Sequence, residues 1–130
     1  MHILLVDDAR TFRYILLKIL KEIGYADVSA AANVEEAKKM LGERQIDLVL
    51  CDWHMPNETG LDLLKHIRSV AALAKIPFVM VTTENDKSKI IEAVKIGMQG
   101  YLFKPVQKTT LVQKLKELAP TYGFQPPLES

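Results

Sequence analysis

The sequence predicts an α/β fold in which five short strands alternate with five helices. Short runs rich in Ile, Leu and Val alternate with longer stretches in which apolar residues recur every three or four positions. Such alternation builds right-handed βαβ units, whose parallel strands form a sheet with helices on both faces. The chain of 130 residues has the length of one domain, so we expect one doubly wound sheet.

The first third of the chain contains the first two predicted strands and the helix between them. Residues 3–6 are uniformly apolar, whereas residues 27–31 form a weaker strand with a single β-branched residue. Asp8 can cap the helix that separates them, and Gly24 suits the position just after its last turn. The apolar face of this helix consists of Phe12, Ile15, Leu16, Ile19 and Ile23.

The middle of the chain contains the second and third helices and the strand between them. Asn33 and Glu36 have the spacing of a capping box, and Thr59 can cap the third helix. Residues 46–51 are almost continuously apolar, which is typical of a central strand buried on both faces. A loop follows this strand, and we expect Trp53 to be partly exposed there. The two helices bury the stripes Val34, Ala37 and Leu41, and Leu61, Leu64 and Ile67.

The last third of the chain contains the fourth and fifth strands and the last two helices. Residues 78–81 and 101–103 form the strands, and Gly97 ends the helix between them. The two helices are marked by Ile90, Ala93 and Val94, and by Leu111, Leu115 and Leu118. We therefore expect one domain over residues 1–118. Residues 119–130 contain several prolines and a glycine, which predicts a loop or disordered tail without a separate domain.

Composition argues against several classes of protein. The net charge is +1, with Lys and Arg interspersed among Asp and Glu, so nothing favours a nucleic-acid partner. Cys51 is the single cysteine, so no internal disulfide can form, and its apolar neighbours predict a buried side chain. The apolar runs are too short to span a bilayer, and the acidic N-terminal region is no signal peptide. We therefore expect a cytoplasmic protein.

Four of the five predicted strands end in polar residues. Because the carboxyl ends of parallel strands meet at one edge of a sheet, we expect these side chains to lie together. Like-charged carboxylates in one place raise one another's pKa unless a cation neutralises them. Oxygen-only ligands at an open site favour Mg²⁺. The side chains expected at this edge are Asp7, Asp8, Asp52, Thr82, Thr83 and Lys104.

These residue types together suit phosphoryl transfer to Asp52. Carboxylates form acyl phosphates, and Mg²⁺, the Lys104 ammonium and the Thr82 hydroxyl would each bind one phosphoryl oxygen. Each residue alone also has an ordinary explanation: Asp8 as a helix cap, Lys104 as a solvated lysine, and Thr82 as a turn residue. A charged Asp52 at the end of an apolar strand is costly, which favours the functional interpretation.

Four segments resemble the receiver domain of two-component response regulators, over about residues 3–118. The segments are Val6-Asp7-Asp8, DWHMPN at residues 52–57, TTE at residues 82–84, and GYLFKP at residues 100–105. The resemblance implies a flavodoxin-like sheet with strand order 2-1-3-4-5 and a cis Lys104–Pro105 bond. It implies that Asp52 is the phosphoacceptor and that Lys104 meets the phosphoryl group. It also implies Mg²⁺ ligands, namely Asp7, Asp8, Asp52 and the backbone carbonyl of His54.

The resemblance further implies a monomeric switch rather than an enzyme, with only self-phosphorylation and autodephosphorylation as its chemistry. A histidine kinase would be the phosphodonor. Thr82 would move toward the phosphoryl group and Tyr101 would swing inward behind it. This movement would reshape the surface of the fourth helix, fifth strand and fifth helix, where an output protein binds. Residues 52–57, with Glu84 and Tyr101, are most similar to stand-alone chemotaxis receivers, whose output protein is a flagellar motor switch component.

Several alternatives stay open. His54 stands where asparagine is often found in the family, which leaves the lifetime of the phosphorylated state undecided. A stand-alone receiver in a phosphorelay or another pathway is the alternative to chemotaxis, because partner choice depends on surface side chains. An aspartyl-phosphate phosphatase of the haloacid-dehalogenase type would carry Asp at position 54. A flavodoxin-like nucleotide binder would need a phosphate-cradling loop after the first strand, where this chain has Asp7 and Asp8.

Overall fold

Five parallel strands form one sheet in the order β2-β1-β3-β4-β5 in the computed structural model, which describes residues 1–128. This order confirms the predicted topology. The strands are β1 (Ile3–Val6), β2 (Val28–Ala31), β3 (Leu48–Cys51), β4 (Phe78–Thr82) and β5 (Gly100–Phe103). The helices are α1 (Arg10–Glu22), α2 (Val34–Glu43), α3 (Gly60–Ser69), α4 (Lys87–Ile96) and α5 (Lys108–Tyr122).

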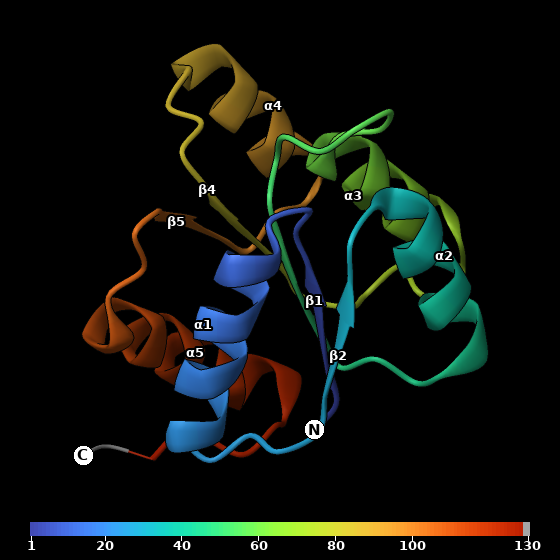
Figure 1. Ribbon diagram of the computed structural model, residues 1–130. Helices are drawn as coiled ribbons and strands as arrows, with labels where there is room; N and C mark the ends of the chain where they lie inside the picture. The colour runs from blue at the N-terminus through green and yellow to red at the C-terminus, as the bar shows by residue number, and fades with distance from the viewer. Residues whose placement is uncertain (129–130) are drawn as a thin grey trace.

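The sheet separates two hydrophobic cores, because successive residues of each strand point to opposite faces. Leu4 and Val49 contribute to the core under α2, α3 and α4, whereas Leu5 and Leu50 contribute to the core under α1 and α5. Figure 1 shows α1 and α5 on one side of the sheet and α2 and α3 on the other. All four residues of β1 and of β3 are buried, as expected for central strands covered on both faces.

The first helix differs from its predicted pattern. Its N-cap is Ala9, which makes no side-chain capping bond, so the prediction that Asp8 caps this helix is wrong. Its buried residues are Leu16 and Leu20, whereas Ile15 is 47% exposed. Leu16 and Leu20 are one helical turn apart and face the sheet together, which turns the neighbouring Ile15 outward.

Side-chain caps set the starts of α2, α3 and α4. Asn33 accepts a hydrogen bond from the backbone of Glu36 at 2.8 Å, which confirms the predicted cap. The Glu36 carboxylate accepts from the N–H of Ala32 rather than of Asn33, so the capping box is not reciprocal. Thr59 and Asp62 form the complete capping box of α3.

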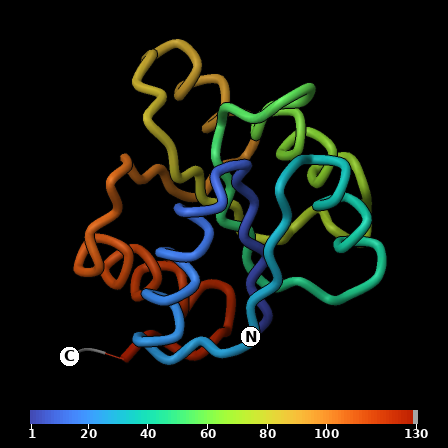
Figure 2. The backbone as a smooth tube through the Cα atoms, viewed as in Figure 1, coloured from blue at the N-terminus to red at the C-terminus, as the bar shows by residue number. Residues whose placement is uncertain are grey.

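The last helix, α5, extends to Tyr122, four residues beyond Leu118, so the prediction of a loop from residue 119 is wrong for this segment. Pro120 lies within its final turn, and Gly123 ends the helix with φ of 72°. The chain then returns to α1, where Leu128 N–H donates to the carbonyl of Ile23 at 2.8 Å. Figure 2 shows this segment beside the α1–β2 connection. Residues 129–130 of the predicted tail lie outside the described residues.

No helix within residues 1–128 is long and apolar enough to cross a membrane. Cys51 is fully buried, as predicted, and burial raises the pKa of its thiol well above the ordinary value.

Candidate functional site

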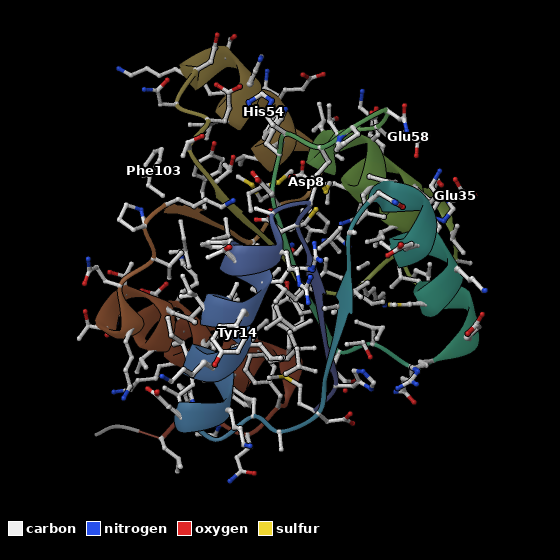
Figure 3. All side chains as sticks on the ribbon, viewed as in Figure 1. Asp8, Tyr14, Glu35, His54, Glu58 and Phe103 are labelled. Atoms are coloured by element: carbon white, nitrogen blue, oxygen red, sulfur yellow. The ribbon has the colours of Figure 1, made fainter. Side chains whose placement is uncertain are left out.

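The polar strand ends converge at one edge of the sheet, as the sequence predicts. Asp52 N–H donates to the carbonyl of Val6 at 2.9 Å, which places Asp52 beside the end of β1. Lys104 N–H donates to the carbonyl of Thr82 at 3.0 Å, which places Lys104 beside the end of β4. Asp8 and His54, labelled in Figure 3, lie at this same end, after β1 and β3.

Three carboxylates form the acidic part of the site. One oxygen from each of Asp7, Asp8 and Asp52 lies within 4.8 Å of the others. Asp7 and Asp52 are buried, whereas Asp8 is exposed. Burial raises the pKa of Asp7, although its hydrogen bond to Lys104 opposes that shift. A set of carboxylate oxygens with one side open to solvent fits a hard divalent cation such as Mg²⁺.

Lys104 joins two of these carboxylates. Its Nζ lies 2.6 Å from Oδ2 of Asp7 and 2.8 Å from Oδ2 of Asp52. Burial acts to lower the pKa of Lys104, but the hydrogen bonds to Asp52 and Asp7 raise it overall, so the side chain stays protonated. The peptide bond between Lys104 and Pro105 is cis, as the family resemblance implies.

The other oxygen of the Asp52 carboxylate is held by the backbone. Oδ1 accepts a hydrogen bond from the N–H of Trp53 at 2.6 Å. The Trp53 side chain is only 3% exposed and belongs to the core under α2, α3 and α4, so the prediction of a partly exposed tryptophan is wrong. The loop turns inward here because Gly60 N–H donates to the carbonyl of Trp53 at 2.8 Å.

Thr82 and Tyr101 meet through the backbone of Glu84. Thr82 is fully buried, and its Oγ1 accepts a hydrogen bond from the N–H of Glu84 at 3.2 Å. Tyr101 is half-buried, and its hydroxyl donates a hydrogen bond to the backbone carbonyl of Glu84. Burial, followed by the nearby charge of Glu84, raises the pKa of Tyr101 to about 12, so this hydroxyl remains a donor at neutral pH.

The Glu84 carboxylate links the loop after β3 to the start of α4. Its Oε1 lies 2.9 Å from Nε2 of His54 and 3.0 Å from Nζ of Lys89, and its Oε2 accepts from the N–H of Asp86. The hydrogen bond from Asp86, followed by that from Lys89, lowers the pKa of Glu84 to about 2. Sequence reasoning missed this link, because residues 54 and 84 carry no spacing signal that would pair them.

Sequence reasoning also missed the surroundings of Lys104. The ring of Phe12, which the helical pattern assigns only to the apolar face of α1, lies under the Lys104 ammonium at 4.0 Å from ring centroid to Nζ. His2 and His66, which the sequence gives no metal-ligand spacing, take no part in the site. His2 Nε2 lies 2.7 Å from Ser29 Oγ on the neighbouring strand.

Comparisons with known proteins agree with this geometry. The family model of the response regulator receiver domain matches residues 3–116. The chain is 39% identical over 118 residues to the chemotaxis protein CheY-3 of Vibrio cholerae, covering 91% of each chain. It is 38% identical over 117 residues to the chemotaxis protein CheY1 of Helicobacter pylori, covering 89% of this chain and 94% of the relative.

Solved structures give the same result. Vibrio cholerae CheY4 superposes with a TM-score of 0.83 at 31% identity, covering 89% of this chain and 96% of that structure. A receiver domain from Clostridium thermocellum superposes with a TM-score of 0.85 at 27% identity, covering 94% and 96%. The family match, the strand order and the clustered strand-end residues therefore show that the chain belongs to the response regulator receiver family of two-component systems.

Proposed function

We propose that the protein is a phosphorylation-controlled switch whose phosphoacceptor is Asp52. The observation that carries this proposal is the position of Lys104, whose Nζ contacts Asp7 at 2.6 Å and Asp52 at 2.8 Å. A lysine held between buried carboxylates at a sheet edge supplies positive charge where a phosphoryl group would bring negative charge. A histidine kinase is the proposed donor, as membership of the receiver family implies.

Asp7, Asp8, Asp52 and the backbone carbonyl of His54 are the proposed ligands of Mg²⁺. The grouping of three carboxylate oxygens within 4.8 Å supports this assignment for the side chains. Mg²⁺, when bound, would neutralise these carboxylates and offer a binding position to one phosphoryl oxygen. Asp8 is the exposed member of the group, so it faces the side from which the ion would arrive.

The proposed reaction forms one bond and breaks one. A carboxylate oxygen of Asp52 attacks phosphorus, and the bond between phosphorus and the donor's histidine nitrogen breaks, which leaves the imidazole with the electron pair. Lys104 and the Thr82 hydroxyl bind phosphoryl oxygens in this scheme. Thr82 would give up its contact with the Glu84 N–H to do so. Water later hydrolyses the acyl phosphate, which releases inorganic phosphate and returns the Asp52 carboxylate.

The proposed output is a change in partner binding at the surface of α4, β5 and α5. Tyr101 and Glu84 connect this surface to Thr82, since the Tyr101 hydroxyl donates to the Glu84 carbonyl. Exposed apolar side chains on the same surface support a protein partner, and they are Ile91, Val94 and Phe103. The names of the relatives support chemotaxis as the pathway. For this pathway we propose a flagellar motor switch component as the partner. We assign the switch to a monomeric receiver unit that includes the whole of α5, to Tyr122.

Intact-mass spectrometry after incubation with acetyl phosphate tests the proposal. We expect a single phosphoryl adduct in wild type that requires Mg²⁺ and is absent from Asp52→Asn. Asp27→Asn is the matched control, because Asp27 is an exposed carboxylate that pairs with His2 at the opposite end of the sheet. An adduct of normal yield on Asp52→Asn would refute the assignment of the phosphoacceptor.

A further inference from the structure

An aromatic ring lies against the lysine of the site. Nζ of Lys104 is 4.0 Å from the ring centroid of Phe12, within the range of a cation–π contact. The same Nζ donates to Oδ2 of Asp7 and of Asp52. An ammonium has three N–H donors, so the two carboxylates and the ring together account for its surroundings. Only 16% of the Lys104 side chain is exposed.

The ring differs from the other two neighbours of Nζ in one respect. Asp7 and Asp52 are carboxylates that a divalent cation would also bind, since both belong to the acidic group of the site. A phenyl ring binds no Mg²⁺, so its contact with Lys104 does not compete with metal binding. Among the contacts of this ammonium within residues 1–128, the one with the Phe12 ring therefore does not depend on the metal or the phosphoryl group.

Lys104 also has room to move if the ring is removed. Lys104 and Phe12 line an apolar hollow of about 290 Å³ together with Ile15, Thr83, Pro105 and Val106. A lysine side chain is long and flexible, and its ammonium is strongly hydrated. Without the ring face, we expect the ammonium to spend more time turned away from Asp52 and toward solvent, while the methylene groups of Lys104 move into this hollow.

We propose that Phe12 is a positioning residue that keeps the Lys104 ammonium at Asp52 when Asp7 is engaged by the metal. This inference rests on the proposed function of the site. Phe12 also packs partly buried against the core under α1 and α5, so a packing role alone must be distinguished from positioning. Replacement by leucine keeps an apolar side chain but removes the ring, whereas replacement by tyrosine keeps the ring face.

The test measures beryllofluoride affinity at saturating Mg²⁺ by NMR titration. We expect Phe12→Leu to raise the dissociation constant about threefold to tenfold, which is the range of one cation–π contact. Phe12→Tyr should restore wild-type affinity. Phe124→Leu is the packing control, because Phe124 is another partly buried aromatic residue against the same core, and we expect it to leave the affinity unchanged.

A second readout does not depend on phosphoryl chemistry. In the free protein, the Lys104 side-chain methylene protons next to Nζ should show an upfield ring-current shift in wild type and Phe12→Tyr. The shift should be lost in Phe12→Leu and kept in Phe124→Leu. Urea unfolding of every variant checks that each is folded under the conditions of the titration.

The outcomes separate this inference from the proposed function. Wild-type protein that binds no beryllofluoride, or Asp52→Asn that binds it normally, would overturn the proposed function and this inference with it. Normal beryllofluoride binding in wild type with equal affinity in Phe12→Leu would overturn the positioning role alone. Equally weakened beryllofluoride affinity in Phe12→Leu and Phe124→Leu would also overturn the positioning role, because general packing would then explain the effect.

Discussion

Gly60, the first residue of α3, lies against the backbone carbonyl of Asp52. A β-carbon on Gly60 would fall 2.2 Å from that oxygen and 3.1 Å from Sδ of Met80. Gly60 N–H also donates to the carbonyl of Trp53, so the start of α3 is bound to the segment that carries Asp52. The position of Asp52, the proposed phosphoacceptor, therefore depends on the absence of a side chain at residue 60.

Gly60→Ala should lower the free energy of unfolding by about 2 kcal/mol or more, because backbone atoms of Asp52 cannot yield as a flexible side chain would. Gly42→Ala is the control, since a β-carbon there meets nothing within 4 Å and Gly42 lies inside α2. We expect this control to gain about 0.5–1 kcal/mol from helix propensity. Urea unfolding measures the stability of both variants. Equal stability of Gly60→Ala and Gly42→Ala would contradict the close contact between residue 60 and the Asp52 carbonyl.

Asp8→Ala should weaken Mg²⁺ affinity about tenfold or more, because it removes one of three carboxylates from the acidic group. The fold should be unaffected, since Asp8 is exposed and is not the cap of α1. A metal titration followed by NMR checks this. Glu35→Ala provides a comparison, because Glu35 is an exposed carboxylate on α2, well away from Asp8 in Figure 3. Unchanged Mg²⁺ affinity in Asp8→Ala would remove Asp8 from the proposed ligands.

Thr82→Ala should leave Asp52 able to accept a phosphoryl group but weaken the response of Tyr101. The hydroxyl of Thr82 is hydrogen-bonded to the Glu84 backbone, to which Tyr101 is also hydrogen-bonded, and in the proposed scheme it moves to bind a phosphoryl oxygen on Asp52. NMR signals of the Tyr101 ring should shift on addition of beryllofluoride in wild type and shift less in Thr82→Ala. Thr83→Ala, at the exposed neighbouring position, should respond as wild type does. A full Tyr101 shift in Thr82→Ala would show that another path couples the two sites.

Glu84→Gln should lower stability at neutral pH, with a difference from wild type that disappears in acid. The pKa of Glu84 is lowered from 4.5 to about 2 in the folded state, first by the Asp86 N–H and then by Lys89. The ionised carboxylate therefore stabilises the fold above pH 4.5, and this stabilisation is lost as the pH falls from 4.5 toward about 2.

Urea unfolding of Glu84→Gln and wild type between neutral pH and about pH 2 measures this difference. Glu58→Gln is the control. Glu58 is a half-exposed carboxylate, and its 3.5 Å ion pair with Lys38 is longer than the 3.0 Å pair of Glu84 with Lys89. We expect a smaller effect of pH on that variant. A stability difference for Glu84→Gln that stayed constant into acid would mean that its charge is not what stabilises the loop.

Much of the site could be predicted because it depends on strand ends. A charged or hydroxyl residue directly after an apolar run is visible in the chain, and parallel pairing brings such residues to one edge. Asp7, Asp52, Thr82 and Lys104 meet in this way, and their backbones are bonded across neighbouring strands. Asp8 illustrates the limit, because the same acidic residue suits a helix cap and a metal ligand, and only the structure excludes the cap.

The residues that surround the site could not be predicted in the same way. Phe12 belongs to an apolar helical pattern whether or not its ring meets Lys104, and the burial of Trp53 depends on how its loop turns toward α3. The pairing of His54 with Glu84 joins loops that are thirty residues apart. The extension of α5 past Pro120 likewise follows from tertiary packing, since Ala119 is buried against the rest of the domain.

The alternation of strands and helices, the polar strand ends and, through the motifs, the receiver family can all be read from the order of residues in the chain. These features are local, because periodicity, capping residues and chain breaks act within a few residues of one another. The contacts between side chains of different elements are visible only in the folded protein: Lys104 with Asp7 and Phe12, and Tyr101 with Glu84. Such contacts depend on strand register and on the rotation of each helix against the sheet. Both are determined jointly by many residues that lie far apart in the chain.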